Sequence, residues 1–118
     1  MSRLEPELAA LIGEEALVRL AEAFGGTRLY VPHQVSARHE IAQAIGLEAA
    51  QRLTARLAPD TINVPLAREL RARHYRAQAR SNRDIARALG LTEDGVEKLF
   101  ARVRRQQVAA AQPDLFAG

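Results

Sequence analysis

Hydrophobic positions at helical spacing dominate the first part of the chain and are followed by a short alternating segment. Residues 7–24 carry an apolar stripe with the 3.6-residue period of a helix, interrupted once at Gly13. Thr27–Val31 alternates about Leu29, which is the two-residue period of a half-buried strand. These periods predict two short helices and then a strand that ends at Pro32.

The same pattern occurs a second time along the chain. Residues 7–32 and 40–65 align without a gap and are identical at ten of 26 positions. Gly25-Gly26 is typical of a left-handed helix end, and Pro59-Asp60 replaces it in the second copy, before the strand Thr61–Val64. Each copy therefore predicts the same unit, which consists of a helix, a glycine, a helix, a turn and a strand.

Both copies need a partner for their strand and for their apolar helix faces. Strands of four or five residues are not stable alone, so these two must pair with each other or with strands of a second subunit. An intertwined homodimer and an intramolecular pseudo-twofold pair both satisfy this need, and of the two we expect the homodimer. The apolar faces to be covered carry Leu8, Leu11, Ile12, Leu17, Leu20 and Phe24 in the first copy and Ile41, Ile45, Leu53 and Leu57 in the second.

The segment SNRDIARALGLTEDGVEKLFARV predicts a helix-turn-helix. Ser81 followed by Asp84 resembles a capping box, Gly90 ends the first helix and Thr92 caps the second. A small residue at Ala86 lets the two helices cross closely, and the glycine allows a sharp turn. The residues predicted to point inward are Ile85, Ala86 and Leu89 in the first helix and Val96, Leu99, Phe100 and Val103 in the second.

A third helix is expected before this motif, from Leu66 to about Ala79. Its predicted inward residues are Leu66, Leu70 and Ala77, and its outer ridge carries Arg73, Arg76 and Arg80.

Charge separates the two parts of the chain. Residues 1–65 contain six basic and eight acidic side chains, a net charge of −2, whereas residues 66–105 contain eleven basic and five acidic ones, a net charge of +6. Such a basic segment favours an anionic partner for the C-terminal part. A solvated helical face is the alternative interpretation of the same charge.

Residues 5–105 together resemble the Mor transcription activator family, named for the middle operon regulator of Mu-type phages. The resemblance lies in AFGGTRLYVP, in IGLEAAQRL and INVP of the second copy, in LARELRARHYRA and in NRDIARALGLTEDGVEKL. It implies a helical dimerisation region with a strand, a helix-turn-helix that binds promoter DNA and helps to recruit RNA polymerase, and a phage, prophage or mobile-element origin. The chain departs from the family pattern in lacking a second Gly-Gly and in carrying acids at Glu93, Asp94 and Glu97.

The candidate DNA-contacting residues follow from the helical wheel of residues 93–105. With the apolar residues inward, Asp94, Lys98, Ala101 and Arg105 form the most outward line, and Arg102 lies beside it. Basic side chains on all three helices and the amide of Asn82 are expected to contact phosphates, which positions a protein without specifying sequence. The complete set is Arg73, Arg76, Arg80, Asn82, Arg83, Thr92, Asp94, Lys98, Ala101, Arg102 and Arg105.

The acids of the second helix have two interpretations. Glu93 and Glu97 lie nearer the core seam, where Arg83 and Arg87 of the preceding helix could pair with them, and this structural role is the one we expect. Acids in a first turn also favour the helix dipole. The alternative is base reading, because a carboxylate can accept a hydrogen bond from cytosine N4.

The C-terminal tail, residues 112–118, is expected to be flexible and contains QPDLF. This pentapeptide resembles the motif by which many replication and repair proteins bind the bacterial sliding clamp. Gln112, Asp114, Leu115 and Phe116 occupy the motif positions. An incidental tail, or one that packs back on the protein, is the other reading.

The sequence gives no indication of an enzyme. The chain has no cysteine, and His33, His39 and His74 lack metal-ligand spacing, so we predict no catalytic residues, no metal and no cofactor. The apolar runs are too short to span a membrane. A cytoplasmic location without a membrane partner is expected.

These observations combine into one prediction. The fold is expected to be mainly α, with a helical N-terminal dimerisation region containing two short strands from the tandem repeat (1–65), a C-terminal helix-turn-helix domain (66–111) and a flexible tail (112–118). The predicted function is that of a homodimeric, sequence-specific regulator that binds double-stranded DNA, an activator acting with RNA polymerase. The alternative is a protein-interaction module with weakened DNA binding that docks on the sliding clamp.

Overall fold

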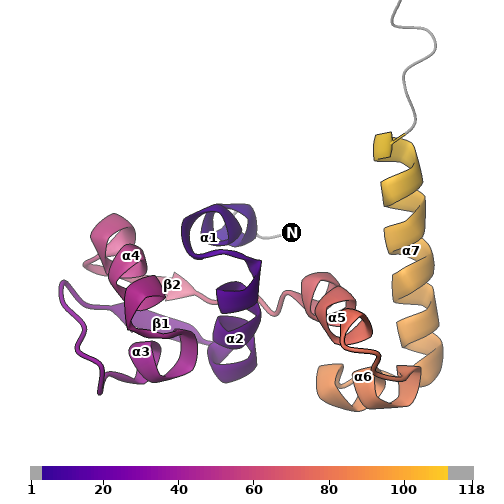
Figure 1. Cartoon of the computed structure of the whole chain (residues 1–118), viewed down its shortest axis with the longest axis horizontal. Helices are drawn as coiled ribbons and strands as arrows, with labels where there is room; N and C mark the ends of the chain where they lie inside the picture. The colour runs from indigo at the N-terminus through magenta and orange to yellow at the C-terminus, as the bar shows by residue number, and fades with distance from the viewer. Residues whose placement is uncertain (1–3, 112–118) are drawn as a thin grey trace, which may run out of the picture. The chain divides into compact units, whose positions relative to one another are not determined.

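The chain folds into two compact units, and the predicted fold class is confirmed. The computed structural model describes residues 4–111. The first unit comprises Met1–Ala67 and the second Arg68–Gly118, so the boundary falls two residues later than the sequence predicts. Helices make up most of the described chain, together with one two-stranded sheet (Figure 1).

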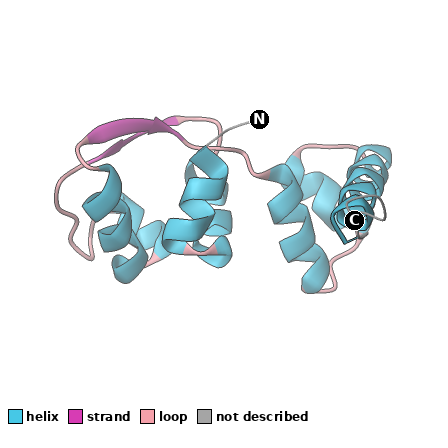
Figure 2. Ribbon diagram, turned by 90° about the horizontal axis from the view of Figure 1, so that it is seen from above, coloured by secondary structure: helices cyan, strands magenta, loops and turns pink. Residues whose placement is uncertain are grey.

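The first unit consists of the two sequence repeats, each folded as predicted. Its elements are α1 (Leu4–Ile12), α2 (Glu14–Phe24) and β1 (Arg28–Val31) in the first copy, and α3 (Glu40–Ile45), α4 (Leu47–Leu57) and β2 (Asp60–Asn63) in the second. Helix α1 packs on α4 and α2 packs on α3, so each copy packs its helices against those of the other. The sheet lies across one face of these four helices (Figure 2).

The two strands pair with each other inside the chain. They run antiparallel, with Arg28 opposite Asn63 and Tyr30 opposite Thr61, and the residue at the centre of this register, Leu29, lies opposite Ile62. Because Ile62 is the equivalent of Leu29 in the second copy, the register is symmetric about this pair. Of the two arrangements considered above, the structure therefore has the intramolecular pseudo-twofold pair, and the homodimer is not required to pair the strands.

The same arrangement covers the apolar helix faces. Leu8, Leu17 and Leu20 of the first copy, and Ile41 and Leu53 of the second, are fully buried. Leu11, Phe24 and Leu57 are half-buried, and the remaining residues of the predicted stripes are buried. The core of the first unit is thus formed by the two copies facing each other.

Equivalent glycines connect the helices of each copy. Gly13 has φ 89° and ψ 157°, and Gly46 has φ 90° and ψ 151°. Residues with a Cβ rarely adopt such positive φ values, so both junctions require glycine. The preserved glycine explains why the break between the helices falls at the same place in both copies.

The second unit contains α5 (Arg68–Ala77), α6 (Asn82–Leu89) and α7 (Glu93–Ala111). The Ser81 hydroxyl accepts a hydrogen bond from the Asp84 amide at 3.1 Å, and the Thr92 hydroxyl accepts one from the Gly95 amide at 3.0 Å. Gly90 ends α6 in the left-handed region with φ 69°. Both predicted caps and the glycine turn of the helix-turn-helix are therefore confirmed.

The predicted packing of α6 and α7 is largely confirmed. The three residues expected to point inward from α6 are buried. In α7, Val96, Leu99 and Val103 are buried, whereas Phe100 is only half-buried because it lies at the edge of the helix pair. Phe100 therefore presents one part of its ring to the surface.

The predicted inward face of α5 was wrong in two of three positions. Leu70 is buried as expected, but Leu66 and Ala77 are exposed, and Ala72 and Tyr75 are buried in their place. The helix begins at Arg68, two residues after Leu66, so Leu66 does not share its face. The Tyr75 ring is covered on its faces by arginine side chains, which the apolar pattern could not indicate.

The last turns of α7 extend beyond α5 and α6 (Figure 1). From Arg104 to Ala110 every residue is exposed, including Val108 at 63%. Although α7 has 19 residues, no helix within residues 4–111 is both long and apolar enough to cross a membrane.

Candidate nucleic-acid interface

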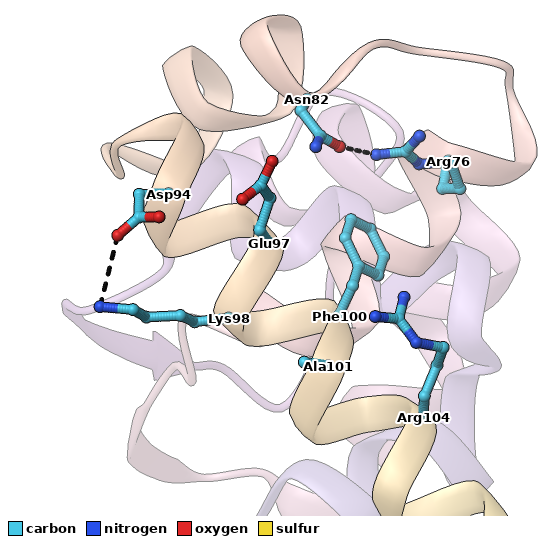
Figure 3. A pocket seen from close by; sticks show the side chains of 8 residues that line it. All are labelled: Arg76, Asn82, Asp94, Glu97, Lys98, Phe100, Ala101 and Arg104. Carbon is cyan, nitrogen blue, oxygen red and sulfur yellow. Dashed lines mark hydrogen bonds and ion pairs between the residues drawn. The ribbon is translucent and has the colours of Figure 1, made fainter.

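An open hollow of about 700 Å³ lies on the second unit, on the exposed side of α7 beside the start of α6. Figure 3 shows side chains from three helices around it. Three of them are basic, two are acidic, and the others are an amide, an aromatic ring and an alanine. The lining residues are Arg76, Asn82, Asp94, Glu97, Lys98, Phe100, Ala101 and Arg104.

Arg76 of α5 is held in the hollow by two contacts. Its guanidinium lies over the Phe100 ring, 4.8 Å from the ring centroid, and its Nη2 donates a hydrogen bond to Oδ1 of Asn82 (Figure 3). Stacking on an aromatic face holds a guanidinium in one orientation while leaving its other donors available. The half-buried ring of Phe100 thus orients a charged group at the surface.

Asn82 lies at the first position of α6 and is half-buried. Because its carbonyl oxygen accepts from Arg76, its NH2 group keeps its donors for other partners. The amide that the sequence predicts as a phosphate contact is therefore oriented by a neighbouring arginine.

Lys98 and Asp94 form an ion pair on the outward face of α7. Lys98 Nζ lies 3.3 Å from Asp94 Oδ2, and both side chains are largely exposed. The order of acid and base four residues apart confirms the predicted exposed pair. An exposed pair of this kind contributes little to stability, and it partly neutralises the lysine.

Glu93 and Glu97 do not occupy the role expected for them. Both are exposed, and within residues 4–111 no ion pair or hydrogen bond joins either of them to Arg83 or Arg87. Glu97 instead lines the hollow, and Figure 3 shows its carboxylate pointing toward the start of α6, where Asn82 lies. The prediction of internal pairing was wrong. Arg83 and Arg87 occupy exposed positions of α6 and do not meet the two acids of α7.

Arg104 is a basic residue of the hollow that sequence reasoning missed. Figure 3 shows its side chain running along α7 toward Phe100. It follows Glu97 by seven residues and Phe100 by four, which places all three on one side of a helix. That spacing is visible in the sequence. The predicted outward line of α7, however, runs through Ala101 and Arg105, on the neighbouring side of the helix, and so does not include Arg104.

Two further predicted DNA contacts also have partners within the protein. Arg102 Nε donates to Glu69 Oε1 at 2.8 Å, which ties α7 to the first turn of α5. The Arg80 guanidinium lies 4.5 Å from the centroid of the buried Tyr75 ring. The Arg102 contact therefore joins α7 to α5, whereas the Arg80 contact lies between α5 and the turn that follows it.

The other predicted contacts are distributed around the unit. Arg73 and Arg83 are exposed on α5 and α6, and the hydroxyl of Thr92 is engaged in capping α7. Arg105 lies outside the hollow, on a neighbouring surface of α7 that also includes Val108. The structure thus brings together Arg76, Asn82, Asp94, Lys98 and Ala101 from the predicted set and adds Glu97, Phe100 and Arg104.

The predicted clamp-binding residues Gln112, Asp114, Leu115 and Phe116 lie outside the described residues. Docking of the tail on a sliding clamp stays a prediction from the sequence alone.

Comparison with known proteins adds no assignment. No protein-family model matches the chain. Neither a curated protein nor a solved structure matches it.

Proposed function

We propose that this chain is a sequence-specific DNA-binding transcription regulator that contacts duplex DNA through α6 and α7. The observation that carries the proposal is the hollow on α7, in which Arg76, Lys98 and Arg104 lie on an open surface of a helix-turn-helix. The hollow is open, and its three basic side chains outnumber its two acids, which suits a long polyanion better than a small molecule.

The alternative of a simply solvated charged face accounts less well for Arg76. A solvated arginine needs no fixed orientation, whereas this one stacks on Phe100 and donates to Asn82. Holding a guanidinium in place before binding reduces the side-chain entropy that a phosphate contact would otherwise cost. The pre-oriented arginine therefore supports a binding role for this surface.

The proposed contacts divide between positioning and reading. Arg76, Arg104 and the amide of Asn82 bind phosphates and fix the register of α7 on the duplex. The exposed side of α7 enters the major groove, where base edges present distinct donors and acceptors. Glu97, which faces the hollow without an ion pair to the α6 arginines, accepts from cytosine N4.

The regulatory part of the proposal rests on the resemblance to Mor activators. It assigns the chain to promoters of phages or mobile elements and predicts a contact with RNA polymerase. The second unit carries eleven basic side chains against five acids between residues 68 and 111, which supports an anionic partner such as DNA.

A mobility-shift titration with random duplex, followed by selection of the bound sequences, tests the proposal. We expect binding that weakens steeply with salt, because neutralising about six phosphates gives a log-log slope of about −5. Selection is expected to enrich a short common sequence. A flat response between about 50 and 200 mM salt, or the absence of any enriched sequence, contradicts the proposal.

A further inference from the structure

The two sequence repeats form a closed pseudo-dimer within the first unit. Copy one contributes α1, α2 and β1, and copy two contributes α3, α4 and β2. The helix contacts between the copies, α1 with α4 and α2 with α3, are related by exchange of the two copies. The sheet follows the same rule, because Leu29 pairs with its own equivalent, Ile62.

Contacts at the margins of the pseudo-dimer also cross between the copies. Thr27 O accepts from the Val64 amide at 2.9 Å, and Gly26 N donates to Val64 O at 2.8 Å, so pairing continues before the start of β1 and after the end of β2. Arg52 of α4 donates through Nε to the Leu11 carbonyl at the end of α1, at 3.2 Å. Each copy therefore satisfies polar groups as well as apolar surface of the other.

The described part of the first unit leaves little apolar surface for another subunit. Its exposed large apolar side chains are Tyr30 on β1, Leu47 on α4 and Leu66 in the segment between β2 and α5, so they do not form one stripe. A stable dimer interface buries about 1,600 Å² and has an apolar centre. Most residues of the faces that would supply such a centre are already buried between the copies, and Leu11, Phe24 and Leu57 are half-buried there.

We propose that the tandem repeat replaces a second subunit, so that one chain with one helix-turn-helix recognises a single DNA half-site without dyad symmetry. The DNA part of this inference rests on the proposed function. Helix-turn-helix dimers read two half-sites one helical turn apart, and their palindromic operators mirror the symmetry of the protein. Here the pseudo-twofold symmetry relates two repeats of one chain, and this pair of repeats is followed by a single helix-turn-helix. Such a chain has no structural reason to prefer a palindrome.

The free protein provides the first test. Light scattering on the full chain is expected to give the mass of one chain at micromolar concentrations. The denaturation midpoint is expected to stay constant over about a hundredfold range of protein concentration, whereas the midpoint of a dimer rises with concentration. Two differently tagged chains that are co-expressed are expected not to co-purify. A dimer mass with a concentration-dependent midpoint overturns the inference, whatever the DNA result.

The complex provides the second test. Native mass spectrometry on the selected duplex is expected to show one chain per site, and a synthetic palindrome of two such sites is expected to bind two chains with a Hill coefficient near one. Cooperative binding of two chains to the minimal selected site overturns the single-half-site reading. If no duplex is bound, the proposed function fails, while the measurements on the free protein still decide whether the repeat replaces a subunit.

Discussion

Leu29 and Ile62 face each other across the two-stranded sheet, and each holds the position of the other in the sequence repeat. They are only 4% and 6% exposed, so this central pair joins the strands to the helices beneath them. The two copies of the first unit therefore meet at a pair of equivalent positions, which hold two different aliphatic side chains of the same size.

Replacing either member of this pair with alanine is expected to destabilise the first unit. Leu29→Ala and Ile62→Ala should each lower the free energy of unfolding by about 2–4 kcal/mol, because each removes buried apolar volume. The double variant should lose less than the sum, since the two side chains share one contact. Tyr30→Ala, which changes a 58% exposed neighbour on β1, is the control and should cost about 1 kcal/mol or less in chemical denaturation. Equal losses in all three variants would contradict the buried pairing.

Ala79 offers a test of the turn between α5 and α6. It has φ 62°, in the left-handed region that an alanine side chain disfavours by about 1–2 kcal/mol. Ala79→Gly is therefore expected to raise the free energy of unfolding of the second unit by about 1 kcal/mol. Ala77→Gly, two residues earlier in α5, should instead lower it by about 0.5 kcal/mol. A loss of stability in both variants would show that Ala79 is not strained.

Arg102 and Arg104 form a matched pair for separating stability from DNA binding. Arg104 lines the hollow, whereas Arg102 is bound to Glu69. Arg104→Ala should weaken binding to all sequences and reduce the salt slope by about 1. Arg102→Ala removes the same charge, but should leave the salt slope unchanged and cost less than about 1 kcal/mol of stability, since its ion pair is partly exposed. Equal effects of the two substitutions on the salt slope would mean that net charge alone governs binding.

Much of this fold is readable from the sequence because local rules decide it. The repeat, the glycine junctions and the caps at Ser81 and Thr92 each act within a few residues, and all appear where predicted. Pairing of the strands within the chain was not decided by the pattern, because the same apolar faces suit a second subunit or a second copy. That choice depends on tertiary contacts between residues far apart in the sequence.

The site was predicted in part, for a similar reason. The helical wheel identifies the exposed side of α7 but not which long side chains have partners on α5. Glu69 engages Arg102, and Phe100 and Asn82 engage Arg76, and none of these contacts follows from spacing within one helix. The wheel alone therefore could not distinguish Arg102, which has a partner on α5, and it omitted Arg104, which lines the hollow.

Glu97 provides the sharpest test of how α7 reads DNA. Its carboxylate lies in the hollow and is exposed, so Glu97→Ala should change the free energy of unfolding by no more than about 0.5 kcal/mol. Removing a negative charge beside a polyanion should strengthen binding to random duplex, while loss of an acceptor for cytosine N4 should relax selection at one base position. Selection on randomised duplexes with the wild type and the variant measures both effects.

Glu93→Ala is the matched control for Glu97→Ala, because Glu93 is also an exposed acid of α7 but does not line the hollow. It should strengthen non-specific binding in the same direction and leave the selected sequence unchanged. If Glu97→Ala also leaves the selected sequence unchanged and instead lowers the denaturation midpoint, the carboxylate holds the fold rather than reading a base. If both substitutions alter the sequence at the same position, the preference arises from the acidic charge at the start of α7 as a whole and not from a contact made by Glu97.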